Sequence, residues 1–326
     1  MAHELPYIAA IEESIREEME RDPSVLYFGQ NIATHENDPF LKQFGSDRVR
    51  VTPISETAEI GMAIGAAIAG YRPVVELYMA EFMLVAMDQV VNEANRFHYM
   101  SKGKVKVPVV LKAGYGFTAG WAGQHTGTIY GMFMGVPGLK VAVPSTAADA
   151  KGLMTTAIRD DNPVVFFHHY LLTLEHGDVP DGEYAVPFGQ ANIAREGTDV
   201  TIVGIGWTVP RALAAAEQLA ADGVSAEVID PRTLAPLDTA TILGSVAKTG
   251  RLVIVDQSTR HGSAAAVIAA EVASEGFGSL RAPIKLVTAL DATVPYSQPM
   301  EEYLMPDEAK IAAAVHEVLS ASAVTA

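Results

Sequence analysis

The chain has 326 residues, which is enough for about two domains. Its composition, with 49% hydrophobic and 19% charged residues, excludes a disordered protein. Asp and Glu (39) outnumber Lys and Arg (23), so neither nucleic acid nor an anionic membrane surface is an expected partner. The absence of cysteine excludes disulfides and thiolate metal sites.

No segment predicts export or membrane insertion. The first residues lack a basic region followed by an apolar core, so no secretory signal is expected. The sequence also has no charge-free apolar run of about 18 residues, the length that a membrane span needs. We therefore expect a cytoplasmic protein without a membrane partner.

The first half of the chain alternates between helical and strand patterns. Ile8, Ile11, Ile15 and Met19 recur at helical spacing and predict an amphipathic first helix. Strands separated by helices of ten or more residues indicate α/β architecture with a mostly parallel sheet. The strands are predicted over 25–29, 74–78, 108–112, 140–144 and 163–167, and further helices between 55 and 70, over 83–99 and over 147–159.

The second half repeats this alternation after a polar segment. Residues 174–197 are rich in turn formers and suit a linker. The prediction is therefore an α/β protein of two domains, each with a mostly parallel sheet flanked by helices. The first domain is predicted over 1–180, the linker over 181–196 and the second domain over 197–326. The second domain has predicted strands over 200–204, 226–230, 251–256 and 284–287 and a helix over 209–222.

The helix that begins after Pro53 and Ser55 carries Glu56 in its first turn. Almost every other residue up to Gly70 is apolar or small, so we expect this helix to be buried on most sides. The helix dipole alone favours an acid there by about 0.3–1 kcal/mol. Glu56 is therefore either a structural residue or a catalytic one, and its own surroundings in the sequence favour the structural role.

Residues 114–127 form a long glycine-rich loop that ends in Gln124-His125-Thr126. The loop follows a predicted buried strand, and α/β proteins place their sites in such loops. Its glycines allow close approach of the backbone to a ligand, and His125 can exchange a proton near neutral pH. A solvated histidine in a mobile loop explains the same residues equally well.

Three further patterns carry little weight by themselves. Asp160 and Asn162 before Pro163 can cage a hard cation, but such clusters are usually turns. His168-His169 has no partner at metal-ligand spacing and is expected to be structural. Gly204-Ile205-Gly206 lacks the third glycine of a dinucleotide fingerprint, because position 209 is Val, which argues against an NAD-binding dehydrogenase.

Taken together, several ordered segments resemble one family over nearly the whole chain. The family is the β subunit of thiamine-diphosphate-dependent 2-oxoacid dehydrogenase E1 components, including the pyruvate, branched-chain and acetoin types. The resemblance implies a transketolase-like pyrimidine-binding domain followed by a transketolase C-terminal-like domain. The segments that carry it are 52–56, 72–76, 88–94, 124–126, 137–141, 149–153, 157–165 and 230–238.

The resemblance also implies roles for single residues. Glu56 would hydrogen-bond N1′ of the cofactor's aminopyrimidine and favour the tautomer that removes the thiazolium C2 proton, a role that an apolar pocket suits. Phe82 would pack on the aminopyrimidine, with Ile54 also in the cofactor site, and His125 would donate a proton to, or stabilise an oxyanion in, the reaction intermediates. A structural potassium ion would be bound by Val109, Ala157, Ile158, Asp160 and Asn162, which replaces the interpretation of that cluster as a turn only.

The resemblance further implies an incomplete site. In the family, Mg²⁺ and the cofactor diphosphate are held by a Gly-Asp-Gly motif on the α subunit, and this sequence has no Gly-Asp-Gly. We therefore expect an α2β2 assembly with an interface near 82–99, and a lipoyl-bearing E2 acyltransferase as a further partner. The activity would be decarboxylation of a 2-oxoacid, or cleavage of acetoin, with transfer of the acyl group to lipoamide.

Thr126 and Gly135 replace a Ser and a His that are common in the family. These differences leave open a thiamine-diphosphate C–C lyase or carboligase without lipoyl transfer. A non-catalytic scaffold subunit is a further alternative. The presence of both Glu56 and His125 argues against the scaffold, because a scaffold needs neither.

Overall fold

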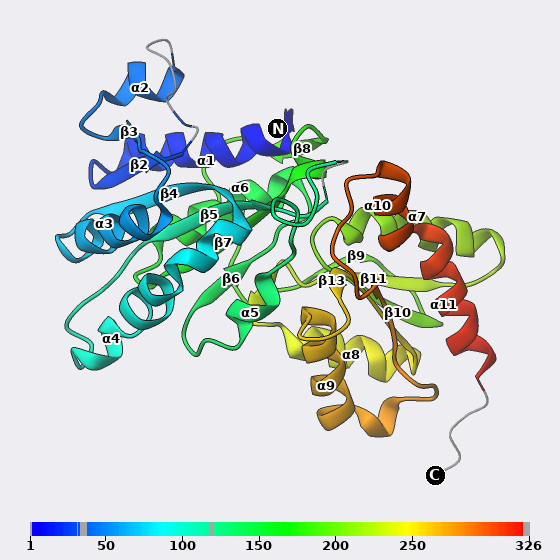
Figure 1. The fold of residues 1–326 in the computed structure, drawn as a ribbon. Coiled ribbons are helices and arrows are strands. Elements are labelled where there is room, and N and C mark those ends of the chain that lie inside the picture. The colour runs from blue at the N-terminus through cyan, green and yellow to red at the C-terminus, as the bar shows by residue number, and fades with distance from the viewer. Residues whose placement is uncertain (1, 31, 33–37, 118–119, 322–326) are drawn as a thin grey trace. The chain divides into compact units, whose positions relative to one another are not determined.

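A computed structural model of the chain describes residues 2–30, 32, 38–117 and 120–321 (Figure 1). Packing contacts divide the chain into two compact units, Met1–Gly116 with Phe133–Phe188 and Phe117–Met132 with Gly189–Ala326. Each unit contains an α/β sheet of the predicted kind. The loop segment Phe117–Met132 packs with the second unit, although it lies within the first domain of the sequence-based division. The boundaries at 180 and 197 stay predictions.

The sheet of the first unit is parallel, with neighbouring strands in the order β6-β7-β5-β4-β2-β3. Every residue of β5 and β7 is buried, as expected for a parallel sheet covered on both faces. The strands are β2 (Val25–Gly29), β3 (Val49–Val51), β4 (Arg72–Met79), β5 (Val110–Tyr115), β6 (Lys140–Ala142) and β7 (Val164–His169).

Helices of this part of the chain lie over both faces of the strands (Figure 1). Helices α1 and α6 pack together through a buried hydrogen bond of 2.9 Å between the hydroxyls of Ser14 and Thr155. The helices are α1 (Tyr7–Arg21), α2 (Pro39–Phe44), α3 (Glu56–Ile68), α4 (Phe97–Met100), α5 (Tyr130–Met134) and α6 (Ala147–Arg159), with a 3₁₀ turn η3 (Tyr170–Leu172) after β7.

The polar segment predicted as a linker contains two short strands. In the first unit, β8 (His176–Pro180) pairs antiparallel with β1 (Ala2–Pro6). In the second unit, β9 (Asn192–Arg195) forms an edge of the sheet. Strand β8 has one buried residue, Val179, and β9 has none. The sequence therefore lacks the alternation of apolar and polar residues that predicts a strand.

The sheet of the second unit has the order β14-β13-β10-β11-β9, with β9 antiparallel and the other pairs parallel. The predicted strands over 200–204 and 226–230 match β10 and β11 at both ends. The strands are β10 (Val200–Gly204), β11 (Ala226–Asp230), β13 (Leu252–Thr259) and β14 (Lys285–Ala289), and β12 (Thr233–Ala235) follows β11 along the chain.

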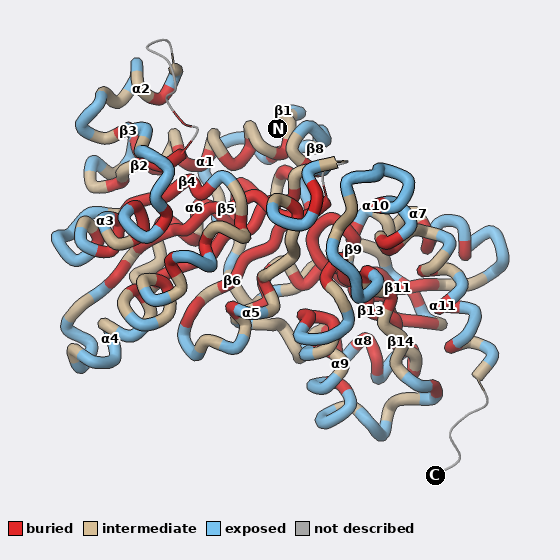
Figure 2. The backbone as a smooth tube through the Cα atoms, viewed as in Figure 1, coloured by how far each residue is buried: buried red, intermediate tan, exposed pale blue. Residues whose placement is uncertain are grey.

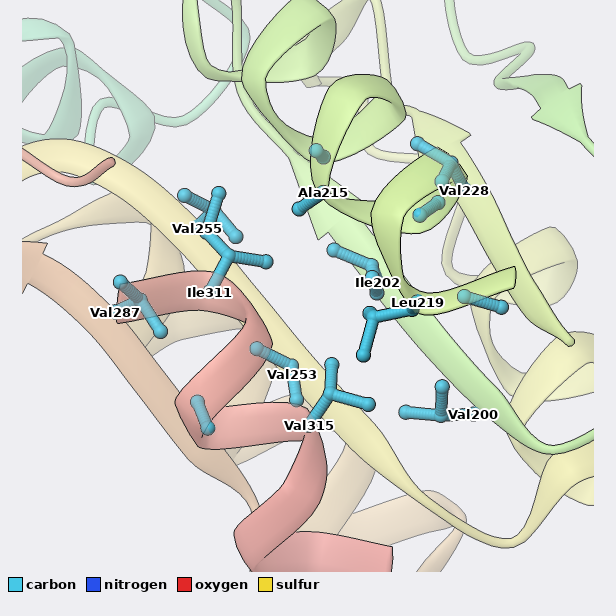
Figure 3. Packing of buried hydrophobic residues seen from close by; sticks show 14 of the residues in the cluster. Val200, Ile202, Ala215, Leu219, Val228, Val253, Val255, Val287, Ile311 and Val315 are labelled. Atoms are coloured by element: carbon cyan, nitrogen blue, oxygen red, sulfur yellow. The ribbon is translucent and has the colours of Figure 1, made fainter. Parts of the chain in front are cut away.

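The core of this unit lies between the sheet and two helices, α7 (Thr208–Ala221) and α11 (Glu308–Ser320) (Figure 3). Ile202 and Val253 from the strands meet Leu219 and Ile311 from the helices, and all four are fully or almost fully buried. Helix α8 lies on the opposite face, where Ser245 hydrogen-bonds Thr201, the neighbour of Ile202. The remaining helices are α8 (Thr239–Thr249), α9 (Ala264–Glu275), η4 (Phe277–Ser279) and α10 (Gln298–Leu304).

The single helix predicted over 83–99 is wrong in its geometry. The chain forms a 3₁₀ helix η1 (Ala80–Ala86), a π-helix η2 (Gln89–Ala94) and then α4. The spacing of the buried residues explains why the helix pitch changes. Buried residues are three positions apart up to residue 86 and four positions apart beyond it. Tight turns followed by wide turns keep these residues on one face. The buried positions are Ala80, Met83, Ala86, Val90 and Ala94.

Helix α3 is also less buried than expected. Ile60 and Ile64 are buried against the sheet side, but Met62 and Ile68 are 51% and 46% exposed. Figure 2 shows this half-buried pattern along the helix. Because apolar and small residues occur all round the helix, the sequence could not show which face the chain's own core covers.

Within the described ranges, no helix is both long and apolar enough to span a membrane.

A buried carboxylate ties α1 to α6. Glu18 is 1% exposed and accepts hydrogen bonds from Arg159 on α6 and from Arg21 on its own helix. Burial raises the pKa of Glu18, but the hydrogen bonds from the two guanidinium groups outweigh it and hold the pKa below its usual 4.5.

We expect Glu18→Gln to lower the free energy of unfolding by about 1.5–3 kcal/mol near neutral pH. Because the folded-state pKa is depressed, this stabilisation is present above about pH 4.5 and is lost as the pH falls through the folded value. Denaturant unfolding at about pH 7 and about pH 3 measures both conditions. The control is Glu271→Gln, at an exposed position of α9. A deficit that is the same at both pH values would contradict the prediction.

Candidate active site

Residues from three adjacent strands meet at one edge of the first sheet. Strand β2 lies between β3 and β4, and all three are parallel. Gln30 follows β2, Glu56 follows β3 at the start of α3, and Phe82 follows β4 in η1. Because parallel strands end at a common edge, these three loops lie together, and this is where α/β folds bind ligands. The structure thus brings the predicted Glu56 and Phe82 to the same edge.

Glu56 is the first residue of α3 and is 9% exposed. Its Oε1 accepts a hydrogen bond of 2.9 Å from the side-chain amide of Gln30, which is 5% exposed. Ser55, the residue before the helix, makes no side-chain cap. The carboxylate is therefore held by a residue 26 positions earlier in the chain and not by its own helix terminus.

Glu59 lies one turn after Glu56 on α3 and is more deeply buried than Glu56. Its exposed fraction is 2%, and its carboxylate accepts three hydrogen bonds. The donors are the Thr52 hydroxyl at 2.8 Å, the backbone N–H of Ser55 at 3.3 Å and the Gln30 amide at 3.1 Å. Glu59 therefore stabilises the turn that leads into α3, and it accepts a hydrogen bond from the same Gln30 amide as Glu56.

Gln30 is placed by a close contact between β2 and β4. Its backbone N–H donates to the carbonyl of Glu76 at 3.0 Å. The preceding Gly29 has φ of +146°, and a Cβ there would lie 2.3 Å from the same carbonyl oxygen. Only glycine fits this position. The one sequence signal for Gln30 is its place directly after a predicted buried strand.

The segments that carry Ile54 and Phe82 meet near the start of α3. The hydroxyl of Thr57 donates to the carbonyl of Val85 at 3.1 Å, which ties the first turn of α3 to η1. Phe82 is half-buried within η1, and Ile54 is 80% exposed just before α3. This hydrogen bond therefore holds the segment that carries Phe82 close to the start of α3.

His125 lies on the loop that packs with the second unit. Ala122 adopts the left-handed region with φ of 55°, and its carbonyl accepts from the backbone N–H of His125 at 3.2 Å and the Thr126 hydroxyl at 2.6 Å. Residues 118 and 119 of this loop lie outside the described residues. His125 is half-buried, while Thr126 is fully buried and fixes the turn.

Two glycines of this segment allow close contacts with other parts of the second unit, and the predicted approach to a ligand stays a prediction. A Cβ on Gly123 would lie 2.3 Å from the Thr293 methyl group, and one on Gly131 would lie 2.4 Å from the carbonyl oxygen of Gly262. The backbone N–H of Gly120 donates to the carboxylate of Glu301 at 2.9 Å. The loop backbone therefore contacts other segments of the second unit at three positions.

A buried carboxylate anchors the end of the same loop. The hydroxyl of Tyr130 donates to Asp256, which also accepts from the backbone N–H groups of Ser258 at 2.8 Å and Ala265 at 2.9 Å. Burial raises the pKa of Asp256, although these hydrogen bonds oppose the effect. Asp256 thus joins the loop, the end of β13 and the first turn of α9.

Charged side chains also lie inside the first sheet. The ammonium of Lys112 on β5 pairs with Glu76 on β4, and both residues are less than one-tenth exposed. His168 Nε2 lies 3.2 Å from Lys112 Nζ. Burial, and then the Lys112 charge, lower the pKa of His168 well below its usual value, so the imidazole is neutral. Across the described ranges, no three His, Asp or Glu side chains gather as a metal-binding group.

The oxygens predicted to bind potassium lie at the opposite edge of the sheet, before β5 and β7. The carbonyls of Ile158 and Asp160 each accept from the Arg72 guanidinium at 3.0 Å, and the Asp160 carboxylate pairs with Lys140. Backbone and carboxylate oxygens are the ligands that hard cations take, and each carbonyl keeps a second lone pair. Oxygen ligands of the kind that a hard cation takes are therefore present, and two side-chain cations already lie among them. The full predicted set is Val109, Ala157, Ile158, Asp160 and Asn162.

Known proteins are similar to the chain over almost its whole length. The family models "Transketolase, pyrimidine binding domain" and "Transketolase, C-terminal domain" match residues 3–173 and 189–311. The acetoin:2,6-dichlorophenolindophenol oxidoreductase subunit beta of Cupriavidus necator is 45% identical, with 98% of each chain covered. The pyruvate dehydrogenase E1 component subunit beta of Rickettsia felis is 43% identical, with 95% of this chain and 96% of the relative covered.

A solved structure described as split gene transketolase, inactive beta4 tetramer, shares the fold. Its TM-score is 0.81 at 22% identity, with 98% of each chain covered. The fold agrees with the two transketolase-type domains that the resemblance implied. The chain therefore belongs to the transketolase-type family of acetoin and 2-oxoacid dehydrogenase β subunits.

Proposed function

We propose that the chain is the β subunit of a thiamine-diphosphate-dependent acetoin or 2-oxoacid dehydrogenase E1, active as an α2β2 assembly. The observation that carries the proposal is the buried Glu56 carboxylate at the carboxyl edge of the sheet, in the part of the chain that matches a pyrimidine-binding domain. When bound, thiamine diphosphate supplies a nucleophilic carbon at C2 of its thiazolium ring.

Glu56 holds the proton at N1′ of the aminopyrimidine in this proposal. The Gln30 amide donates a hydrogen bond to Oε1 of the carboxylate, which belongs to the first residue of α3. A carboxylate that is largely removed from water shares a proton with a ring nitrogen more effectively than a solvated one. Phe82 would pack on the ring, and Ile54, which is 80% exposed in this chain, would be a further residue of the cofactor site.

His125 serves as proton donor to the substrate oxygen. Its backbone is fixed by the turn at Ala122, and the loop that carries it is anchored through Tyr130 and Gly120. A histidine is suited to this task because it exchanges a proton near neutral pH.

The α subunit supplies the part of the site that binds the diphosphate and Mg²⁺. Support comes from the sequence, which has no Gly-Asp-Gly, and from exposed apolar residues near the predicted interface. An α partner also agrees with the subunit names of the relatives. A lipoyl-bearing E2 acyltransferase would accept the acyl group. The exposed residues are Leu84 at 41%, Val85 at 66%, Tyr99 at 87% and Met100 at 68%.

We expect the purified chain to need its α subunit, thiamine diphosphate and Mg²⁺ together for activity. Reduction of 2,6-dichlorophenolindophenol with acetoin, pyruvate and branched-chain 2-oxoacids measures turnover and ranks the substrates, with lipoyl domain as the alternative acceptor. Turnover by the chain alone would contradict the proposal. A turnover that forms C–C bonds but never acylates lipoamide would favour the carboligase alternative, while an active assembly whose activity survives loss of both Glu56 and His125 would favour the scaffold.

Glu56→Gln is expected to abolish the accelerated exchange of the cofactor C2 proton, because a neutral amide cannot hold the N1′ proton. The loss should reach about 10²–10⁴-fold, the range for a general acid–base residue. Deuterium exchange at C2 in the assembled complex measures this step directly. The matched control is Glu20→Gln, which changes a solvent-exposed carboxylate on α1 in the same way. Exchange that persists in Glu56→Gln would rule out the proposed role.

We expect K⁺ to raise the free energy of unfolding of the chain by binding at the predicted potassium site. At a K⁺ concentration about ten times its Kd the gain is about 1.4 kcal/mol. Thermal unfolding in K⁺ and in choline at equal ionic strength measures the effect, and Asn162→Ala should reduce it. Equal midpoints in the two salts would show that Arg72 and Lys140 alone satisfy this cluster of oxygens.

A further inference from the structure

The side-chain amide of Gln30 lies between two buried carboxylates. Its Nε2 donates to Glu56 Oε1 at 2.9 Å and to Glu59 Oε2 at 3.1 Å. The three residues are 5%, 9% and 2% exposed. We propose that Gln30 is a positioning residue, which separates the two charges without taking up a proton and fixes the orientation of Glu56. The proposal rests on the function proposed for Glu56 above.

The chemistry of the amide explains why this residue suits the position. A carboxamide –NH₂ has two N–H groups and no titratable proton, so it can give one hydrogen to each neighbour at any pH. Two carboxylates that converge on one site repel each other, and without a donor between them they tend to share a proton. The Gln30 amide removes the need for that proton, so Glu56 stays available to hold the proton of the cofactor ring.

The contacts of the two carboxylates differ. Glu59 has two further donors, the Thr52 hydroxyl at 2.8 Å and the backbone N–H of Ser55 at 3.3 Å. Among the described residues, Gln30 is the one hydrogen-bond donor that the structure gives to the Glu56 side chain. Loss of the amide should therefore release Glu56 while Glu59 stays in place.

Gln30 itself has a rigid support. The contact of Gly29 with the Glu76 backbone leaves no room for a Cβ, and the Gln30 backbone N–H is bonded to the Glu76 carbonyl at 3.0 Å. Glu76 is in turn paired with Lys112 inside the sheet. A positioning side chain carried by a fixed strand end holds its partner more precisely than one on a mobile loop.

Two substitutions at this position separate hydrogen bonding from charge. Gln30→Glu keeps the shape and adds a third carboxyl group, and Gln30→Leu removes both donors. The matched controls are Gln43→Glu and Gln43→Leu, because the Gln43 amide donates to Glu20 at 2.5 Å on the exposed surface. Thermal unfolding of each variant shows whether it folds.

The first readout uses the chain without cofactor. We expect Gln30→Glu to show the infrared band of a protonated carboxyl group at neutral pH, because three converging carboxylates must bind a proton. The band should be additional to any carboxyl signal of the wild-type chain, and Gln43→Glu should not add it. Its absence from a folded Gln30→Glu would overturn the proposal that the amide keeps converging charges apart.

The second readout is C2 proton exchange in the complex with the α subunit, thiamine diphosphate and Mg²⁺. Gln30→Leu should slow exchange by about 10- to 100-fold, the effect of losing one charge-assisted hydrogen bond, with little change in the cofactor concentration at half-saturation. Gln30→Glu should be slow at neutral pH and recover as the pH falls, since its carboxyl group becomes a donor only when protonated. The Gln43 variants should match the wild type.

The outcomes distinguish this proposal from the proposed function. If the wild-type complex does not accelerate exchange, the proposed function fails, and the infrared readout still decides whether the amide separates the charges. If the wild type accelerates exchange and Glu56→Gln abolishes it, but both Gln30 variants exchange at the wild-type rate, the positioning role is overturned and the function stands.

Discussion

The candidate site depends on one constraint, the parallel pairing of β3, β2 and β4. Parallel neighbours end at the same edge of a sheet, so the loops after them meet whatever their separation in the sequence. The close contact at Gly29 fixes the register of β2 on β4 at that edge. Backbone hydrogen bonds consequently hold the ends of these strands together, and the Thr57 hydroxyl links the start of α3 to η1.

The first unit buries charge in two different ways. Glu76 is paired with the Lys112 ammonium, which neutralises it and favours a structural role. Glu56 and Glu59 are instead bridged by the neutral amide of Gln30. A carboxylate paired with a cation is a weak base, whereas one that accepts a single amide hydrogen bond keeps its capacity to hold a proton. This difference in partner distinguishes Glu56 from Glu76, and the number of donors distinguishes it from Glu59.

The second unit determines the shape of the His125 loop. Small residues at Gly123 and Gly131 let the loop backbone approach Thr293 and Gly262, and Asp256 secures Tyr130. Fixing a loop by backbone contacts limits the positions that a half-buried histidine can take. The second unit thus fixes the backbone of the loop that carries His125.

The sequence by itself determined the elements whose apolar pattern is long and regular. Strands β2, β10 and β11 and helix α6 have the predicted ends, because buried runs and turn residues define them locally. The family resemblance indicated Glu56, Phe82 and His125 as site residues, and these roles stay predictions.

Only the tertiary structure decided the rest. The short polar strands β8 and β9 and the change of pitch between η1 and η2 depend on neighbours that are distant in the sequence. Gln30 lies 26 residues before Glu56 and belongs to no local motif, so its role follows only from the pairing of β2 with its neighbours. The physical reason is that hydrogen bonds between buried polar groups are set by the packing of strands, which composition and periodicity do not encode.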